Sequence, residues 1–123
     1  MDTARIAVRD EDPTEAVVTV YGEVDLGTRD QLRESLHTAT AAPGVKRIVV
    51  DLTQTRFIDS SGIYTLVHGY QEAHEAGIDY YITGATGPVH RVLELTGVLD
   101  LLLGDTPIDK RSPNVPGRSG ASP

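Results

Sequence analysis

The chain has 123 residues, the size of a single domain, with the 39% hydrophobic and 24% charged residues of an ordinary globular protein. It contains no cysteine, which excludes disulfides, thiolate catalysis and zinc–thiolate sites. Its net charge of −7 offers no basic face to nucleic acid, and no apolar run approaches the length that spans a bilayer. The N-terminus has no apolar leader, so we expect a cytoplasmic protein that binds neither nucleic acid nor membrane.

The first part of the chain predicts a hairpin followed by a helix. Residues 5–9 alternate apolar and polar side chains, and residues 16–21 are rich in β-branched ones, so both predict strands around a turn at residues 10–15. Residues 25–40 then predict an amphipathic helix, because apolar residues recur at helical spacing. These apolar residues are Leu32, Leu36 and Ala39.

The second part alternates strands and helices. Residues 47–52 form a contiguous apolar run that predicts a strand buried on both faces, as in a parallel sheet. A helix is expected from Ser61 to a C-terminal cap at Gly77, then a strand over residues 78–82 and a short helix that ends near Gly97. The helix from Ser61 has its apolar face at Ile63, Leu66, Val67 and Tyr70. The fold predicted is therefore α/β, with a mixed sheet that opens on an antiparallel hairpin.

The composition changes near the C-terminus. Residues 98–103 are nearly all apolar and are expected to pack on the domain, whereas residues 105–123 are rich in proline, glycine and serine. Such a segment has almost nothing to bury, so we expect a domain over residues 1–104 and a disordered tail over residues 105–123.

The segment Asp59-Ser60-Ser61-Gly62 is the candidate functional site. It follows the strand at residues 47–52 and begins a helix, so it is expected at the edge of an α/β sheet where ligands bind, with a helix N-terminus that favours anions. Asp and Ser are also preferred helix caps, and composition alone favours a cap over a functional site here. The preceding Phe57 and Ile58 are expected in the core.

Three segments of the chain, in order, resemble the STAS domain family, and more narrowly its bacterial anti-sigma factor antagonists. The resemblance covers about residues 5–103. It is carried by Val20-Tyr21-Gly22-Glu23-Val24-Asp25, by Phe57-Ile58-Asp59-Ser60-Ser61-Gly62-Ile63 preceded by Ile48-Val49-Val50-Asp51-Leu52, and by Val89-His90-Arg91-Val92-Leu93-Glu94-Leu95-Thr96-Gly97-Val98.

The resemblance implies a protein-binding switch rather than an enzyme, with no cofactor and no metal. Ser60 matches the family's phosphoacceptor, Ser61 a neighbouring residue that is not the usual acceptor, and Asp25 an acidic residue on an adjacent loop. The unphosphorylated form is expected to bind an anti-sigma factor that is itself a serine kinase, and a serine phosphatase is expected to restore that form. The partner-binding residues expected are Asp25, Asp59, Ser61, Gly62, Ile63 and Tyr64.

Two alternatives remain at this point. The chain departs from the family at Tyr64, where a second glycine is common, so it is also compatible with a STAS regulatory module that has another protein target or a nucleotide or small-molecule ligand. A hydrolase that uses Ser60 as nucleophile is less favoured, because Ile58 stands where a nucleophile elbow needs glycine.

Overall fold

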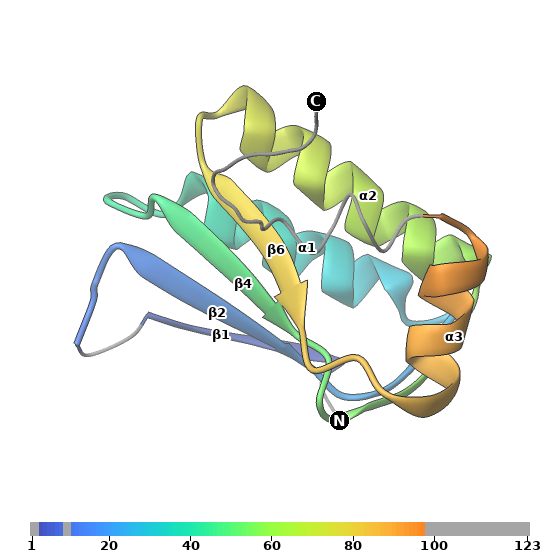
Figure 1. Cartoon of the computed structure of the whole chain (residues 1–123). Coiled ribbons are helices and arrows are strands. Elements are labelled where there is room, and N and C mark those ends of the chain that lie inside the picture. The colour runs from blue at the N-terminus through green and yellow to red at the C-terminus, as the bar shows by residue number, and fades with distance from the viewer. Residues whose placement is uncertain (1–2, 9–10, 98–123) are drawn as a thin grey trace, which may run out of the picture.

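The computed structural model describes residues 3–8 and 11–97 (Figure 1). Its elements follow in the order β1 (Ala4–Val8), β2 (Glu15–Val20), β3 (Gly22–Val24), α1 (Arg29–Ala41), β4 (Arg47–Asp51), β5 (Thr55–Ile58), α2 (Ser60–Glu75), β6 (Asp79–Thr83) and α3 (Gly87–Leu95). The α/β class, the alternation of strands and helices and the opening hairpin predicted from the sequence are confirmed.

The main sheet has four strands in the order β1-β2-β4-β6. The pairing of β1 with β2 is antiparallel, and the other two pairings are parallel, which makes the sheet mixed as predicted. The register aligns Val18 of β2 with Val50 of β4 and Ile82 of β6, so one continuous apolar row crosses the sheet. This row faces the helices.

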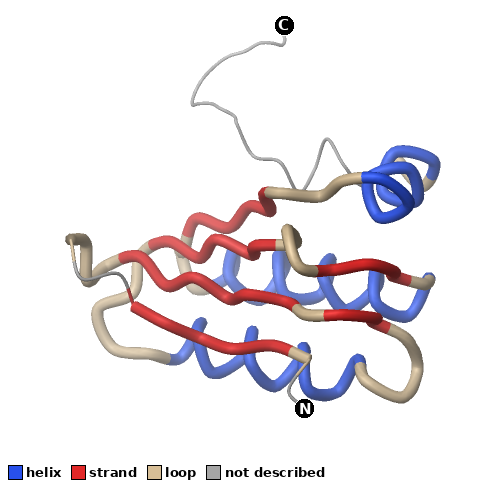
Figure 2. Tube along the Cα trace, turned by 90° about the horizontal axis from the view of Figure 1, so that it is seen from below, coloured by secondary structure: helices blue, strands red, loops and turns tan. Residues whose placement is uncertain are grey.

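Helices α1 and α2 lie on the same side of the four-stranded sheet, and α3 lies at its end (Figure 2). The burial of β4 on both faces is confirmed, because Ile48, Val49 and Val50 are all buried. Val49 lies on the face of the sheet away from the two long helices, where its register neighbours are Val17 and Tyr81.

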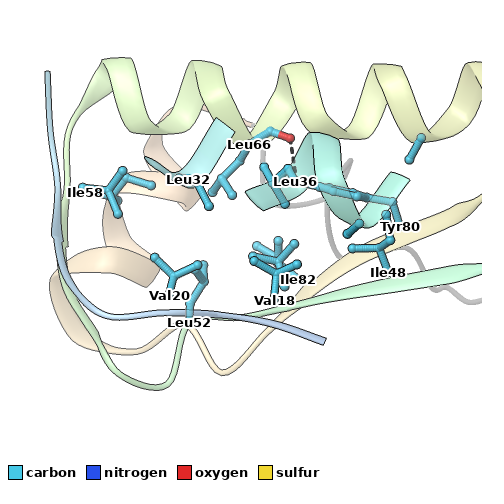
Figure 3. Close-up of a cluster of buried hydrophobic side chains, with 14 of the residues drawn as sticks. Val18, Val20, Leu32, Leu36, Ile48, Leu52, Ile58, Leu66, Tyr80 and Ile82 are labelled. Atoms are coloured by element: carbon cyan, nitrogen blue, oxygen red, sulfur yellow. Dashed lines mark hydrogen bonds between the residues drawn. The ribbon is translucent and has the colours of Figure 1, made fainter. Parts of the chain in front are cut away.

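The core fills the space between the sheet and the two long helices (Figure 3). Leu32 and Leu36 from α1 and Leu66 from α2 are fully buried there, as the helical spacing predicted. The ring of Tyr80 is also buried, and its hydroxyl donates a hydrogen bond of 2.8 Å to the carbonyl oxygen of Leu66. Burial raises the pKa of Tyr80, so this hydroxyl stays protonated and remains a donor.

The helix predicted from Asp25 begins four residues later, at Arg29. The reason is a local turn in which Asp25 and Thr28 bond each other's backbone. The Asp25 carboxylate accepts from the amides of Gly27 (2.9 Å) and Thr28 (3.2 Å), and the Thr28 hydroxyl oxygen accepts from the Asp25 amide (3.0 Å). Side-chain bonds of this kind compete with helical backbone bonds and hold residues 25–28 outside the helix.

A second, two-stranded parallel sheet of β3 and β5 was not predicted. It lies beyond the carboxyl ends of β2 and β4 and inserts β5 between β4 and the candidate site. The short strand β5 therefore separates the strand at residues 47–52 from the candidate site, which still lies at the carboxyl ends of parallel strands as predicted. The prediction that Phe57 is in the core is wrong, because its side chain is 45% exposed, whereas Ile58 is buried as expected.

The predictions for residues 98–103 and for the tail at residues 105–123 lie outside the described residues. Within residues 3–8 and 11–97, no helix is long and apolar enough to cross a membrane.

Candidate functional site

The candidate site lies where α2 begins. Ser60 is the first residue of α2 and follows β5 after the single residue Asp59. In Figure 1 the first turn of α2 lies at the end of the molecule toward which β4 and β6 point, and α1 also starts there. The site is thus at the carboxyl ends of parallel strands, the edge at which open α/β sheets bind their ligands.

Asp59 is the N-cap residue of α2. One of its carboxylate oxygens, Oδ1, accepts from the amides of Ser61 (2.9 Å) and Gly62 (3.0 Å) and from the Ser61 hydroxyl (2.6 Å). The Ser61 hydroxyl lowers the pKa of Asp59 most, and the amides of Gly62, Ser61 and Leu26 lower it further against the opposing effect of burial. Asp59 is therefore ionised at neutral pH.

The two serines have different roles in this turn. The hydroxyl of Ser61 is half-buried and donates to Asp59, so it is part of the cap. The side chain of Ser60 is exposed, and among the described residues its hydroxyl has no hydrogen-bond partner. Of the two, only Ser60 has a hydroxyl that is free to meet another protein.

The helix N-terminus is less open to an anion than the sequence suggested. The amides of Ser61 and Gly62, which have no backbone partner within the helix, donate to the Asp59 carboxylate. The amide of Ile63 donates to the Asp59 carbonyl oxygen at 3.0 Å. A phosphoryl group on Ser60 would therefore lie beside a carboxylate rather than in an empty cradle of amides.

The loop that carries Asp25 is joined to the candidate site. The Asp59 amide donates to the Val24 carbonyl oxygen at 3.0 Å, and the backbone of Leu26 helps to lower the pKa of Asp59. Asp25 lies between these two contacts, so the structure brings it next to Asp59, as the resemblance implied.

Gly62 and Ile63 are in the core and support the site from beneath. A Cβ atom on Gly62 would come within 2.6 Å of Ile58 Cγ1 and 2.7 Å of Val24 Cγ1, so only glycine allows α2 to start this close to β3 and β5. Ile63 is 6% exposed. Both residues are among those predicted to bind the partner, and in this structure both are buried.

Three exposed apolar side chains lie on the segments that form the candidate site. Tyr64 follows Ser60 by one helical turn and is 68% exposed, and Leu26, next to Asp25, is also 68% exposed. Phe57 precedes Asp59 on β5. The sequence did not indicate that Leu26 is exposed beside the site. The one available signal was an apolar residue between Asp25 and Gly27, where a turn can form.

Nothing in the described part of the chain assembles a hydrolytic or metal site around Ser60. No described histidine is hydrogen-bonded to the Ser60 hydroxyl, and His37 instead contacts Glu72 through Nδ1 at 2.7 Å. Over residues 3–8 and 11–97, no group of three or more metal-ligating side chains is found. The geometry is that of an exposed serine beside two carboxylates and several apolar side chains.

Comparison with known proteins gives consistent matches. The model of the STAS domain matches residues 5–113. The anti-sigma-B factor antagonist of Staphylococcus aureus is 32% identical over 85 residues, which cover 69% of this chain and 78% of that protein. An anti-sigma factor antagonist from Mycobacterium paratuberculosis superposes with a TM-score of 0.71 at 26% identity, over 85% of this chain and 86% of that one. The Bacillus cell fate determinant SpoIIAA in its phosphorylated form superposes with a TM-score of 0.60 at 19% identity, over 85% and 90% of the two chains, a likeness of fold.

Proposed function

Because the chain belongs to the STAS domain family, and within it to the anti-sigma factor antagonists, we propose that it binds an anti-sigma factor through the turn at Ser60 and that phosphorylation of Ser60 ends this binding. The observation that carries the proposal is the contrast between the two serines. Ser60 is exposed with a free hydroxyl, whereas the hydroxyl of Ser61 is bonded to Asp59.

The surface around Ser60 suits a protein partner. Exposed tyrosine, phenylalanine and leucine side chains close to a polar centre are typical of a binding surface, in which apolar contacts provide affinity and polar groups provide specificity. We assign the partner contacts to Asp25, Asp59, Ser60 and Tyr64, together with Leu26. Gly62 and Ile63 hold this surface in place from the core, and Ser61 holds it through the cap.

Phosphorylation acts on the partner more than on the fold. A phosphoserine adds a charge of about −1.5 to −2 beside the ionised Asp59 and close to Asp25. A like charge on the partner about 5 Å away would cost roughly 3 kcal/mol at an effective dielectric near 20, which weakens binding about a hundredfold. SpoIIAA, whose fold this chain resembles, has been described in a phosphorylated form, which supports phosphorylation as the modification.

The kinase in this scheme is the anti-sigma factor itself, and a serine phosphatase returns the protein to its binding form. The chain acts as a substrate and a binding protein, with no reaction of its own.

Mapping the phosphorylation site tests the proposal. The protein is incubated with ATP and each purified serine-kinase anti-sigma factor of its source organism, and the product is analysed by mass spectrometry. One phosphate on Ser60 is expected, absent from Ser60→Ala and retained in Ser61→Ala. A phosphate on Ser61 instead, or no phosphate with any of these kinases, would contradict the proposal.

A further inference from the structure

A groove between α1 and α2 shares Tyr64 with the surface around Ser60, and its other lining residues have no part in the proposed function. It has a volume of about 450 Å³. Its lining residues are Arg29, Asp30 and Arg33 from α1 and Tyr64, Thr65 and His68 from α2. Tyr64 lies four residues after Ser60, one turn along the same side of α2, so the groove is continuous with the surface around Ser60.

The groove carries a local positive charge on an acidic protein. Arg29 and Arg33 lie one turn apart on α1, and both approach the same carboxylate oxygen of Asp30, at 3.9 Å and 3.4 Å. Both basic residues of the groove come from α1, because α2 contains no lysine or arginine. They stand out on a chain whose net charge is −7. Two guanidinium groups thus share one carboxylate, and exposed pairs of this kind hold their members only weakly.

The two arginines retain most of their hydrogen-bonding capacity. Each guanidinium has five N–H donors, and the only side-chain hydrogen bond found for either arginine joins Arg33 to Asp30 at 3.4 Å, within the described part of the chain. A planar fork of donors matches the two oxygens of a carboxylate. A glutamate or aspartate from a partner is therefore the chemical group that this end of the groove fits best.

The shape of the groove favours a protein segment over a small molecule. Small-molecule sites bury most of their ligand, whereas here Tyr64 is 68% exposed and the side chain of Arg33 is 63% exposed. The Tyr64 ring stacks against His68 with their centroids 6.4 Å apart, which gives the wall of the groove an aromatic surface. Tyrosine and arginine are also the residue types that contribute most to protein interfaces.

We infer that this groove binds an acidic segment of the same anti-sigma factor that contacts Ser60, an inference that rests on the proposed function. The binding face then has two parts of opposite charge, with Asp25 and Asp59 beside Ser60 and Arg29 and Arg33 along the groove. Such a pattern fixes the orientation of the partner and selects among related anti-sigma factors, because a partner without the acidic segment loses the second contact.

Charge reversal in the groove tests the inference. The affinity of each purified anti-sigma factor that binds the wild-type protein is measured by calorimetry for Arg33→Glu, Arg29→Glu and the control Lys46→Glu. Lys46 is exposed and precedes β4, at the end of the strands opposite the groove. Lys46→Glu changes the net charge by the same amount as the groove variants, so it controls for overall charge. Both groove variants are expected to weaken binding at least about tenfold at low salt, and the control less than about twofold. High salt should reduce the difference.

A gain of affinity provides the complementary test. Asp30→Asn removes the carboxylate that competes for both arginines, so it is expected to strengthen binding several-fold, an effect that damage to the fold would not produce. Circular dichroism melting curves of all variants should match that of the wild type, since the substituted side chains are exposed.

The possible failures are distinguishable. Equal weakening by Arg33→Glu and Lys46→Glu would mean that only the overall charge matters and would overturn the inference. An unchanged affinity for Arg33→Glu, with binding lost in Ser60→Asp, would overturn the inference and leave the proposed function intact. If the wild-type protein binds none of the purified anti-sigma factors of its source organism, the proposed function and this inference fail together.

Discussion

Replacing Asp59 with alanine removes the acceptor that organises the first turn of α2. Three donors lose their partner, namely the amides of Ser61 and Gly62 and the hydroxyl of Ser61. Loss of an N-cap alone costs about 0.5–2 kcal/mol. Because the Asp59 carboxylate is charged and bonds several donors, we expect the upper end, about 2 kcal/mol of unfolding free energy, or a fall in Tm of roughly 10 °C for a domain of this size.

Urea denaturation followed by circular dichroism at pH 7 measures this loss. The matched control is Asp30→Ala, which removes an aspartate from the first turn of α1 that is 73% exposed and contacts only arginine side chains. The control should change the unfolding free energy by less than about 0.5 kcal/mol. If Asp59→Ala costs no more than Asp30→Ala, the account of how this turn is held is wrong.

The Asp59 carboxylate also makes the stability of the fold depend on pH. The folded protein lowers the pKa of Asp59 below its usual value of 3.8, so the carboxylate stabilises the fold above that pH, and the stabilisation is lost as the pH falls through the folded-state pKa. Asp59→Asn keeps an oxygen acceptor without the charge. The difference in unfolding free energy between wild type and Asp59→Asn should be constant near neutral pH and should close under acid. A difference that persists or widens there would contradict the argument.

Two further substitutions test the packing that supports the site. Gly62→Ala places a Cβ within 2.7 Å of side-chain atoms of Ile58 and Val24, so we expect a destabilisation of about 1–3 kcal/mol in urea denaturation, although alanine normally favours a helix. A gain in stability would show that α2 can move away from the short sheet. Tyr80→Phe removes the 2.8 Å hydrogen bond to the Leu66 carbonyl oxygen and should cost about 1 kcal/mol by the same assay, and no measurable loss would mean that this buried bond contributes nothing.

Much of the fold follows from patterns in the sequence. The apolar spacing of α1 and α2 predicts which of their side chains are buried, because this period matches the geometry of a helix. The short strands β3 and β5 were not predicted. They are three and four residues long, and so short a segment has no period to detect. The exposure of Phe57 follows from the same gap, since its environment is set by a strand pairing that local sequence does not reveal.

The candidate site could be located from the sequence but not described in detail. Three adjacent residues were all possible caps for α2, and only the geometry shows that Asp59 is the cap, that Ser61 bonds to it and that Ser60 remains free. The groove beside it joins Arg29 and Arg33 to Tyr64, more than 30 residues along the chain. Contacts between such distant residues arise only once two helices pack together, so neither arginine carried any signal of a role.

In the proposed function, the phosphorylation state of Ser60 controls binding to an anti-sigma factor. The most direct measurement is a calorimetric titration of the cognate anti-sigma factor with the unphosphorylated protein, the protein phosphorylated on Ser60, and Ser60→Ala as the matched control. We expect the phosphorylated form to bind about a hundredfold more weakly, and Ser60→Ala to bind like the unmodified protein. Equal affinity for the phosphorylated and unphosphorylated forms would contradict the proposed function.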